Sequence, residues 1–237
     1  MDEYYFDKVS AERPVIFTEG YCTHVKAEWA GQPLILEEWQ KNLFRNIFGW
    51  KRKDTGFRKH TNAWIEIPRK NSKSTMIAAL GLYGMVGEDP VEAGAEIYTA
   101  AADKEQANII FEMASGMVHG NKELSSILEV MRKAIYYSKY SSTFKSLSRE
   151  SKTKHGLNSY MNLVDEVHAH PDGELIDVLV TGTGVRREPL NIFITTAGVR
   201  SEDNVGWKMH EYARKVSEGV IKDDSWYVEI YAADEED

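Results

Sequence analysis

The chain has 237 residues, of which 42% are hydrophobic and 28% charged, which suits an α/β domain with a full core and argues against global disorder. Its net charge of −8 argues against a protein that coats nucleic acid over its whole surface, and its single cysteine excludes a disulfide framework within one chain. No apolar run approaches the roughly 18 residues of a membrane span, so we expect no membrane partner.

The first predicted helix covers residues 37–50, where apolar side chains recur at helical spacing. An apolar strand is expected at 62–67, and the polar turn after it ends in Lys73 and Ser74, which open an apolar helix over 73–86. A strand, a tight turn and a Lys-Ser pair at a helix start predict a phosphate-binding loop. The free amides at the helix start face an anion, the lysine reaches the outer phosphates, and the serine hydroxyl can hold Mg²⁺.

This turn departs from the usual phosphate-loop pattern at two positions. The pattern G-x-x-x-x-G-K-[ST] has glycine where this chain has Ile67 and Ser72. The alternative for residues 68–74 is a basic surface turn that caps a helix.

The middle of the chain alternates between further predicted strands and helices. A strand is expected at 95–100, and Asp103 is typical of the N-cap of a following helix. Another helix is predicted at 124–131, and two short strands are predicted at 134–137 and 143–147.

An apolar strand that begins at Tyr160 ends in two adjacent carboxylates, Asp165 and Glu166. In phosphate-loop proteins that hydrolyse nucleotides, the first acid of such a pair organises Mg²⁺ and the second polarises the attacking water. The alternative is a strand that runs into the acidic start of a helix. Because the pair follows the Lys-Ser turn after about ninety residues, the two features together favour a nucleotide site.

A third apolar strand, 190–194, ends in small residues that include Thr195 and Thr196. Hydroxyl groups at the end of a core strand can sense a γ-phosphate, although threonine also commonly ends strands. The remaining predicted elements are helices at 174–180 and 207–216 and a strand at 226–232. Since strands and helices alternate, we predict an α/β fold with a mainly parallel sheet and helices on both faces.

With these elements in order, the chain resembles the ATPase domain of a tailed-bacteriophage terminase large subunit, of the HK97-like branch, across roughly residues 20–235. In that family the phosphate loop lacks the first glycine, so Ile67 fits. Ser72 remains a departure, because its Cβ stands where glycine allows a free φ. The other matching segments are Leu36-Glu37-Glu38-Trp39-Gln40, Tyr98-Thr99-Ala100-Ala101-Ala102, Thr153-Lys154-His155-Gly156-Leu157-Asn158, Asp165-Glu166-Val167-His168-Ala169-His170 and Thr195-Thr196-Ala197-Gly198.

The resemblance implies a P-loop NTPase of the additional-strand catalytic-glutamate type, with the Thr195 strand between the strands that lead to Lys73 and Asp165. ATP would be bound on the adenine side by Gln40 and at the phosphates by Pro68, Arg69, Lys70, Asn71, Ser72, Lys73 and Ser74. Mg²⁺ would be held by Ser74 and Asp165. The catalytic residues would be Lys73 and Glu166, and hydrolysis would be coupled to movement by Thr195, Thr196 and Ala197.

A ring ATPase also needs an arginine finger supplied by a neighbouring subunit. We favour Arg149, which lies in a polar loop before the Asp165 strand, over the other candidates Arg132, Arg186, Arg187 and Arg200. Arg69 is a possible contact to the triphosphate in the same subunit.

The resemblance further implies a DNA-packaging motor that acts in the host cytoplasm. Its expected partners are double-stranded DNA bound without sequence preference, the phage portal, the small terminase subunit and further copies of itself in a ring. The resemblance also divides the chain into an adenine-side segment (1–60), an ATPase core (61–200) and a linker subdomain (201–237), with the nuclease domain absent. A basic cluster at 51–60 is a candidate for DNA contact.

Three alternatives remain at this stage. The first is a helicase-like ATPase that remodels DNA, and the second is a nucleotide-binding scaffold that does not hydrolyse, which Ser72 supports. The third is a metal hydrolase, because His168 and His170 stand next to Asp165 and Glu166.

Overall fold

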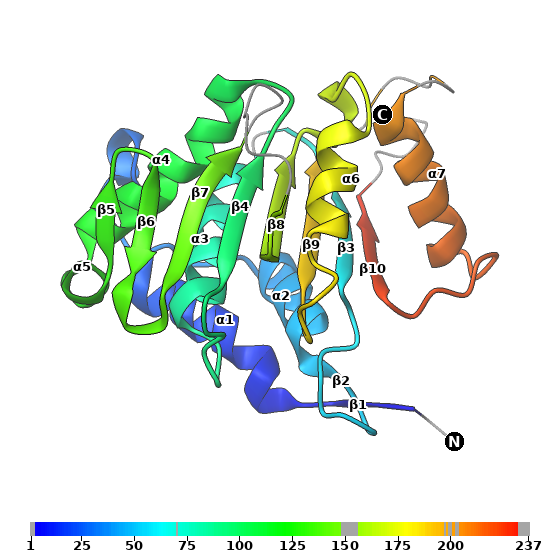
Figure 1. Ribbon diagram of the computed structural model, residues 1–237, viewed down its shortest axis with the longest axis horizontal. Helices are drawn as coiled ribbons and strands as arrows, with labels where there is room; N and C mark the ends of the chain where they lie inside the picture. Colours follow the sequence, from blue (N-terminus) through cyan, green and yellow to red (C-terminus); the bar gives the residue numbers. More distant parts are fainter. Residues whose placement is uncertain are drawn as a thin grey trace.

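The computed structural model describes residues 3–69, 71–147, 156–196, 198, 201 and 204–231. Within them the main sheet has eight strands, in the spatial order β10 (Trp226–Ile230), β3 (Asn62–Glu66), β9 (Leu190–Thr195), β8 (Ser159–Asp165), β4 (Glu96–Ala100), β7 (Ser142–Leu147), β6 (Ala134–Tyr137) and β5 (Glu129–Met131) (Figure 1). Every neighbouring pair from β10 to β7 is parallel, whereas β6 runs antiparallel to β7 and β5. The predicted mainly parallel sheet is confirmed.

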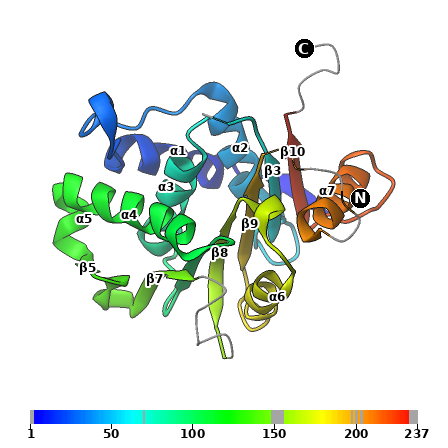
Figure 2. The same cartoon turned by 90° about the horizontal axis from the view of Figure 1, so that it is seen from above.

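Each face of this sheet packs against its own helices, because side chains alternate along each strand. On β3, Ala63 and Ile65 belong to one apolar cluster and Trp64 belongs to the other. The first cluster includes side chains of α1 (Lys8–Tyr21), α2 (Glu38–Gly49), α3 (Lys73–Val86), α4 (Lys104–Gly120) and α5 (Lys122–Ile127). The second includes side chains of α6 (Glu174–Thr181) and α7 (Val205–Ser217), on the opposite side of the sheet (Figure 2).

The strand order brings three strand ends together at the carboxyl edge of the sheet. β9 lies between β3 and β8, as the resemblance implies, with Glu66 paired to Thr195 and Asp165 paired to Ile194. The turn after β3 is tied to β9 by a hydrogen bond from the Ile67 amide to the Thr195 carbonyl oxygen at 3.1 Å. In open α/β sheets, ligands bind outside the carboxyl ends of the strands, so a ligand site is expected at this edge.

The predicted helix at 124–131 is wrong beyond Ile127. Asn121 caps α5 by accepting a hydrogen bond from the Leu124 amide, and the helix ends before Leu128, whose backbone is extended. Residues of β5 pair instead with β6, with Val130 opposite Ile135. Pairing with β6 decides the structure of this segment, because it satisfies backbone groups of residues that the local sequence alone would place in a helix.

The sequence pattern did not predict α1. Its start is marked by Asp7, whose carboxylate accepts hydrogen bonds from the amides of Val9 and Ser10, but Pro14 inside the helix is a contrary signal. Ahead of it, β1 (Tyr4–Phe6) pairs antiparallel with β2 (Trp50–Arg52). None of the described helices combines the length and the apolar character that crossing a membrane requires.

Candidate nucleotide site

The turn from Ile67 to Ser72 connects β3 to α3, as predicted for a phosphate loop. The side-chain amide of Asn71 donates to the Pro68 carbonyl oxygen at 3.1 Å, which closes the turn on itself. Arg69 is exposed, and Lys70 lies outside the described residues. No side chain caps the start of α3 among the described residues, so its first amides are free to bind an anion at the positive end of the helix dipole.

Ser72 occupies the left-handed backbone region, with φ 53° and ψ 30°. Residues other than glycine adopt this region at a cost of roughly 1–2 kcal/mol, because Cβ crowds the following carbonyl group. Ser72 thus adopts a backbone conformation that glycine takes without this cost, at the position where the loop pattern has glycine.

We predict that Ser72→Gly is tolerated and binds ATP at least as tightly as the parent, because glycine adopts the left-handed conformation without strain. Ser72→Ala is the matched control, since it removes only the hydroxyl group and keeps Cβ. Titration with a fluorescent ATP analogue measures both. An affinity loss of about tenfold, ~1.4 kcal/mol, for Ser72→Gly would contradict the prediction and assign Ser72 a contact of its own.

Ser74 and Asp165 meet at the base of the loop. The Ser74 hydroxyl donates to Asp165 Oδ2 at 3.2 Å, although the two residues are far apart in the sequence. Asp165 is 6% exposed, and burial, with the nearby Glu166 carboxylate as a second cause, raises its pKa to about 6 from the usual 3.8. A half-buried hydroxyl and a buried carboxylate that face each other are oxygen ligands of the kind that Mg²⁺ prefers.

The raised pKa of Asp165 gives a prediction about stability without Mg²⁺. Between pH 3.8 and about 6 the folded protein binds more protons than the unfolded chain, so this residue destabilises the fold above pH 6 and ceases to do so below pH 4. Asp165→Asn should therefore raise the free energy of unfolding at pH 8 by up to about 3 kcal/mol and have little effect at pH 4. Denaturant titrations in EDTA at both pH values measure the difference. A variant no more stable than the parent at pH 8 would contradict the assigned burial cost.

Lys73 and Glu166 face each other across the same edge. The Lys73 side chain is 8% exposed, and its Nζ lies 3.4 Å from Glu166 Oε1. Nζ forms no hydrogen bond of good geometry within the described residues. A buried ammonium group with three donors and a single ion pair fits an anionic ligand such as a phosphate chain.

The end of β9 contributes the next contacts. Thr196 Oγ1 lies 3.5 Å from Glu166 Oε2, and Thr195 Oγ1 lies 2.7 Å from His168 Nδ1. Both threonines are buried. Ala197 lies outside the described residues.

Gln40 is buried and closes a capping box at the start of α2, where its Oε1 accepts the Glu37 amide at 2.9 Å. Its neighbour Trp39 packs against Tyr231 with ring centroids 5.5 Å apart. The Tyr231 amide in turn donates to the Glu66 carbonyl oxygen at 2.9 Å, so the start of α2 lies at the same sheet edge as the phosphate loop. The Gln40 side-chain oxygen is thus used to cap the helix.

His168 and His170 do not form a metal centre with other side chains. No group of three or more histidine, cysteine or acidic side chains able to hold a metal is found among the described residues. His168 is engaged with Thr195 and Glu166, and His170 is buried, which lowers its pKa. The metal-hydrolase alternative therefore has no ligand set in this part of the chain.

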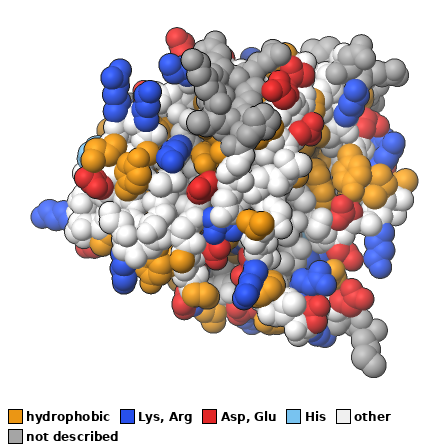
Figure 3. All heavy atoms as spheres, viewed as in Figure 1, with side chains coloured by type: hydrophobic (Ala, Val, Ile, Leu, Met, Phe, Trp, Pro, Cys, Tyr) orange, Lys and Arg blue, Asp and Glu red, His pale blue; other side chains and the backbone are white. Residues whose placement is uncertain are grey.

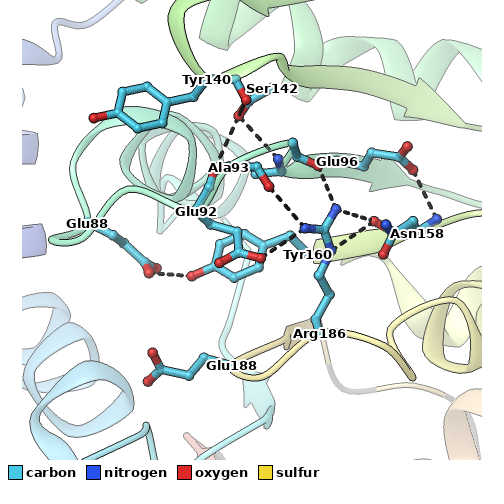
Figure 4. Close-up of polar contacts among 12 residues, drawn as sticks. Glu88, Glu92, Ala93, Glu96, Tyr140, Ser142, Asn158, Tyr160, Arg186 and Glu188 are labelled. Carbon is cyan, nitrogen blue, oxygen red and sulfur yellow. Dashed lines mark hydrogen bonds and ion pairs between the residues drawn. The ribbon is translucent and has the colours of Figure 1, made fainter.

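Arg186 is engaged within its own subunit at the opposite edge of the sheet. Its guanidinium group donates to Glu92 Oε1 at 2.9 Å and to the carbonyl oxygens of Ala93, Gly94 and Asn158. Figure 4 shows Arg186 among Glu92, Ala93 and Asn158. These groups lie at the amino ends of β4 and β8, and a seven-residue strand such as β8 spans roughly 20 Å. Arg132 and Arg187 are exposed, while Arg149 and Arg200 lie outside the described residues.

The basic cluster at 51–60 is largely neutralised by acidic neighbours. Lys51 lies 3.6 Å from Glu188, Lys59 lies 3.9 Å from Asp224, and Arg58 is buried against Glu88 at 3.2 Å; Arg52 pairs with Asp54 at 3.3 Å. On the face seen in Figure 3, basic and acidic side chains are interspersed and do not form one continuous basic field.

A phosphate loop after β3, an acid pair after β8 and the strand β9 between them define a P-loop NTPase of the type with an additional strand and a catalytic glutamate. Within that class the chain belongs to the family described as the ATPase domain of the terminase large subunit, which matches residues 38–215.

Relatives agree with this assignment. The chain is 31% identical to the terminase large subunit of Enterobacteria phage HK97 over 196 residues, which are 81% of this chain and 38% of that protein. Protein YmfN of Escherichia coli K12 is 35% identical over 82 residues, which are 35% of this chain and 18% of that protein. The chain thus spans well under half the length of these relatives.

Solved structures share the fold. The crystal structure of the HK97 large terminase superposes with a TM-score of 0.80 at 24% identity, over 96% of this chain and 45% of that one. A mutant form of the ATPase domain of the Thermus phage P74-26 large terminase superposes with a TM-score of 0.52 at 12% identity, over 77% of this chain and 88% of that one.

Proposed function

We propose that this chain is the ATP-hydrolysing motor domain of a viral DNA-packaging terminase and that it drives double-stranded DNA into a procapsid. The observation that carries the proposal is the meeting of four side chains at one sheet edge. Ser74 contacts Asp165 at 3.2 Å, and Lys73 contacts Glu166 at 3.4 Å. The adjacent residues Lys73-Ser74 and Asp165-Glu166 supply the chemical groups, and the family assignment supplies the reaction.

In this proposal the amides at the start of α3 and the Lys73 ammonium group bind the β- and γ-phosphates of ATP. Ser74 and Asp165 hold Mg²⁺, which neutralises charge on the phosphates. Glu166 orients a water molecule and accepts its proton as the water oxygen attacks the γ-phosphorus. The bond between the γ-phosphorus and the β–γ bridging oxygen breaks, and ADP and phosphate leave. Gln40 contacts the adenine edge, and Thr195, Thr196 and Ala197 report the state of the site to the DNA-gripping surface.

The proposal extends to the partners and the place of action. DNA contact is to the phosphates and independent of sequence, since a motor must move any genome. The basic cluster at 51–60 is a poor candidate, because acidic side chains already neutralise it. The portal, the small terminase subunit and a ring of identical chains complete the assembly, which acts in the host cytoplasm.

We also propose the division into an adenine-side segment (1–60), an ATPase core (61–200) and a linker subdomain (201–237). The last segment is joined to the core through β10, which extends the main sheet beside β3. The family assignment does not favour a helicase-like ATPase or a scaffold that does not hydrolyse ATP.

The function and the ring are tested together by mixing two inactive variants. Lys73→Ala loses the pocket but keeps Arg149, whereas Arg149→Ala keeps the pocket and loses the proposed finger. In a ring with one kind of head-to-tail interface, an equal mixture pairs an intact pocket with an intact finger at roughly a quarter of all interfaces. We expect each variant alone to be inactive and the mixture to regain about that fraction of the parental ATP turnover.

The control replaces Lys73→Ala in the mixture by a variant that carries both substitutions, which cannot donate a finger and should restore nothing. Turnover per subunit should also rise with protein concentration in the parent. If the first mixture stays inactive under conditions in which rings form, the finger is not Arg149, and Arg132, Arg186, Arg187 and Arg200 are to be tested in the same way. Parent protein without any ATP turnover in the assembled state would contradict the proposed function itself.

A further inference from the structure

His168 contacts the proposed catalytic base from the side opposite Lys73. Its Nδ1 lies 3.2 Å from Glu166 Oε2 and 2.7 Å from Thr195 Oγ1. Its main-chain amide also donates to Thr195 Oγ1 at 3.4 Å. The side chain therefore joins the end of β8 to the end of β9 immediately behind the carboxylate.

The hydrogen on His168 can be placed from these contacts. Thr195 has one hydroxyl hydrogen, and its Oγ1 lies 3.1 Å from the Thr196 carbonyl oxygen, to which it can donate. We assign this arrangement, in which Thr195 Oγ1 accepts from His168 and Nδ1 carries a hydrogen, because Nδ1 also faces the Glu166 carboxylate. The same N–H group is within reach of Glu166 Oε2, which can only accept while the carboxylate is ionised.

The two oxygens of Glu166 consequently have different surroundings. Oε2 is contacted by His168 Nδ1 and by the Thr196 hydroxyl at 3.5 Å, whereas Oε1 faces Lys73 Nζ at 3.4 Å. The backbone of Glu166 is itself in the left-handed region, with φ 48°, which a residue other than glycine keeps only where its surroundings hold it. The contacts to Oε2 hold the side chain on the phosphate side.

Resting on the function proposed above, we infer that His168 is a positioning residue for ATP hydrolysis. It anchors Glu166 Oε2 so that Oε1 is the oxygen that accepts the proton from the attacking water. Once Lys73 turns to a phosphate, Oε1 loses its ion pair, while His168 and Thr196 keep the carboxylate in place. The side chain acts through Glu166 and does not touch the reacting atoms.

The packing around His168 connects this anchor to α7. Asn204, the N-cap of α7, donates its side-chain amide to the His168 carbonyl oxygen at 3.0 Å. A Cβ on Gly206 would come within 2.6 Å of His168 Cα, and one on Gly198 within 2.9 Å of His168 Cβ. The start of α7 thus packs directly against His168. A movement of α7 would therefore displace His168 and change the orientation of Glu166.

Two amide substitutions test the role of the Nδ1 hydrogen. The side-chain amide of His168→Asn places an N–H donor close to the position of Nδ1, whereas that of His168→Gln moves it outward toward the position of Nε2. Both are polar and similar in size, so differences in folding are small. We expect His168→Gln to lower kcat by roughly 10- to 100-fold with ATP affinity nearly unchanged, and His168→Asn to retain most of the parental kcat.

His168→Gln combined with Glu166→Gln separates a positioning role of His168 from a structural role. If His168 acts through the Glu166 carboxylate, His168→Gln should lower the residual turnover no further there. His168 and His210 line the same cavity at this edge of the sheet, but His210 pairs with Glu66 at 2.7 Å. His210→Asn is therefore the control for a change of a histidine in the cavity lining, and the kcat of this variant should stay near the parental value.

Equal kcat values for parent and His168→Gln would overturn the inference, and so would an equal loss in the two backgrounds or an equal loss in His168→Asn and His168→Gln. If Glu166→Gln itself turned over ATP at the parental rate, the assignment of the base would fail instead. The two failures are therefore distinguishable.

Discussion

Replacement of Lys73 by alanine is expected to abolish ATP turnover and leave the fold intact. Lys73 is the first residue of α3, its ammonium group is buried, and within the part of the chain that the structure describes it forms an ion pair with Glu166. Removing it takes away the charge that faces the phosphates as negative charge develops on them. The loss of one such group in a water-poor site costs at least roughly 10²- to 10³-fold in kcat. Steady-state ATPase assays measure the effect, and circular dichroism checks the fold.

Lys104→Ala is the matched control for this substitution. Lys104 is likewise the first residue of a helix that follows a parallel strand of the same sheet, β4, but its side chain is exposed. The same chemical change at the equivalent place should leave turnover within about twofold of the parent, since exposed charges contribute little. Near-parental turnover in Lys73→Ala would show that the turn after β3 is not the phosphate loop.

Replacement of Glu166 by glutamine is expected to preserve the binding of ATP and Mg²⁺ and to lower hydrolysis by roughly 10²- to 10⁴-fold. The amide is nearly isosteric with the carboxylate and can still accept hydrogen bonds from His168 and Thr196, so the local structure should survive. The group that accepts the proton from water is lost. Equilibrium binding and single-turnover assays on the same preparation separate the two effects.

Asp165→Asn is the contrasting variant. Because Asp165 contacts the Ser74 hydroxyl, its replacement by an amide should weaken Mg²⁺-dependent nucleotide binding first. Equal nucleotide affinity and equal turnover in the two variants would refute the division of work between the neighbouring acids.

Much of the candidate site could be predicted because its functional groups lie in short segments of the sequence. The Lys73-Ser74 pair at a helix start and the Asp165-Glu166 pair at a strand end each need only a few consecutive residues and an apolar strand before them. The left-handed conformation of Ser72 was foreseeable in the same way, from glycine in the usual pattern. Boundaries of most strands followed from alternation and turn residues, with errors of one or two positions.

Other features were decided by partners distant in the sequence. The segment after Ile127 became a strand because β6 offered a pairing edge, and α1 formed although Pro14 argued against it. Arg186 looked like a free basic residue, yet four groups from two loops enclose its guanidinium group. No pattern in residues 180–190 contains that information.

The sequence by itself determined which chemical groups stand at the ends of β3, β8 and β9, since hydrophobic periodicity places each group just beyond a buried strand. Only the tertiary structure decided how those groups face one another. The order β3-β9-β8 sets Thr196 and His168 against one oxygen of Glu166 and Lys73 against the other. Strand order results from packing the whole sheet between two layers of helices, and no local segment encodes it.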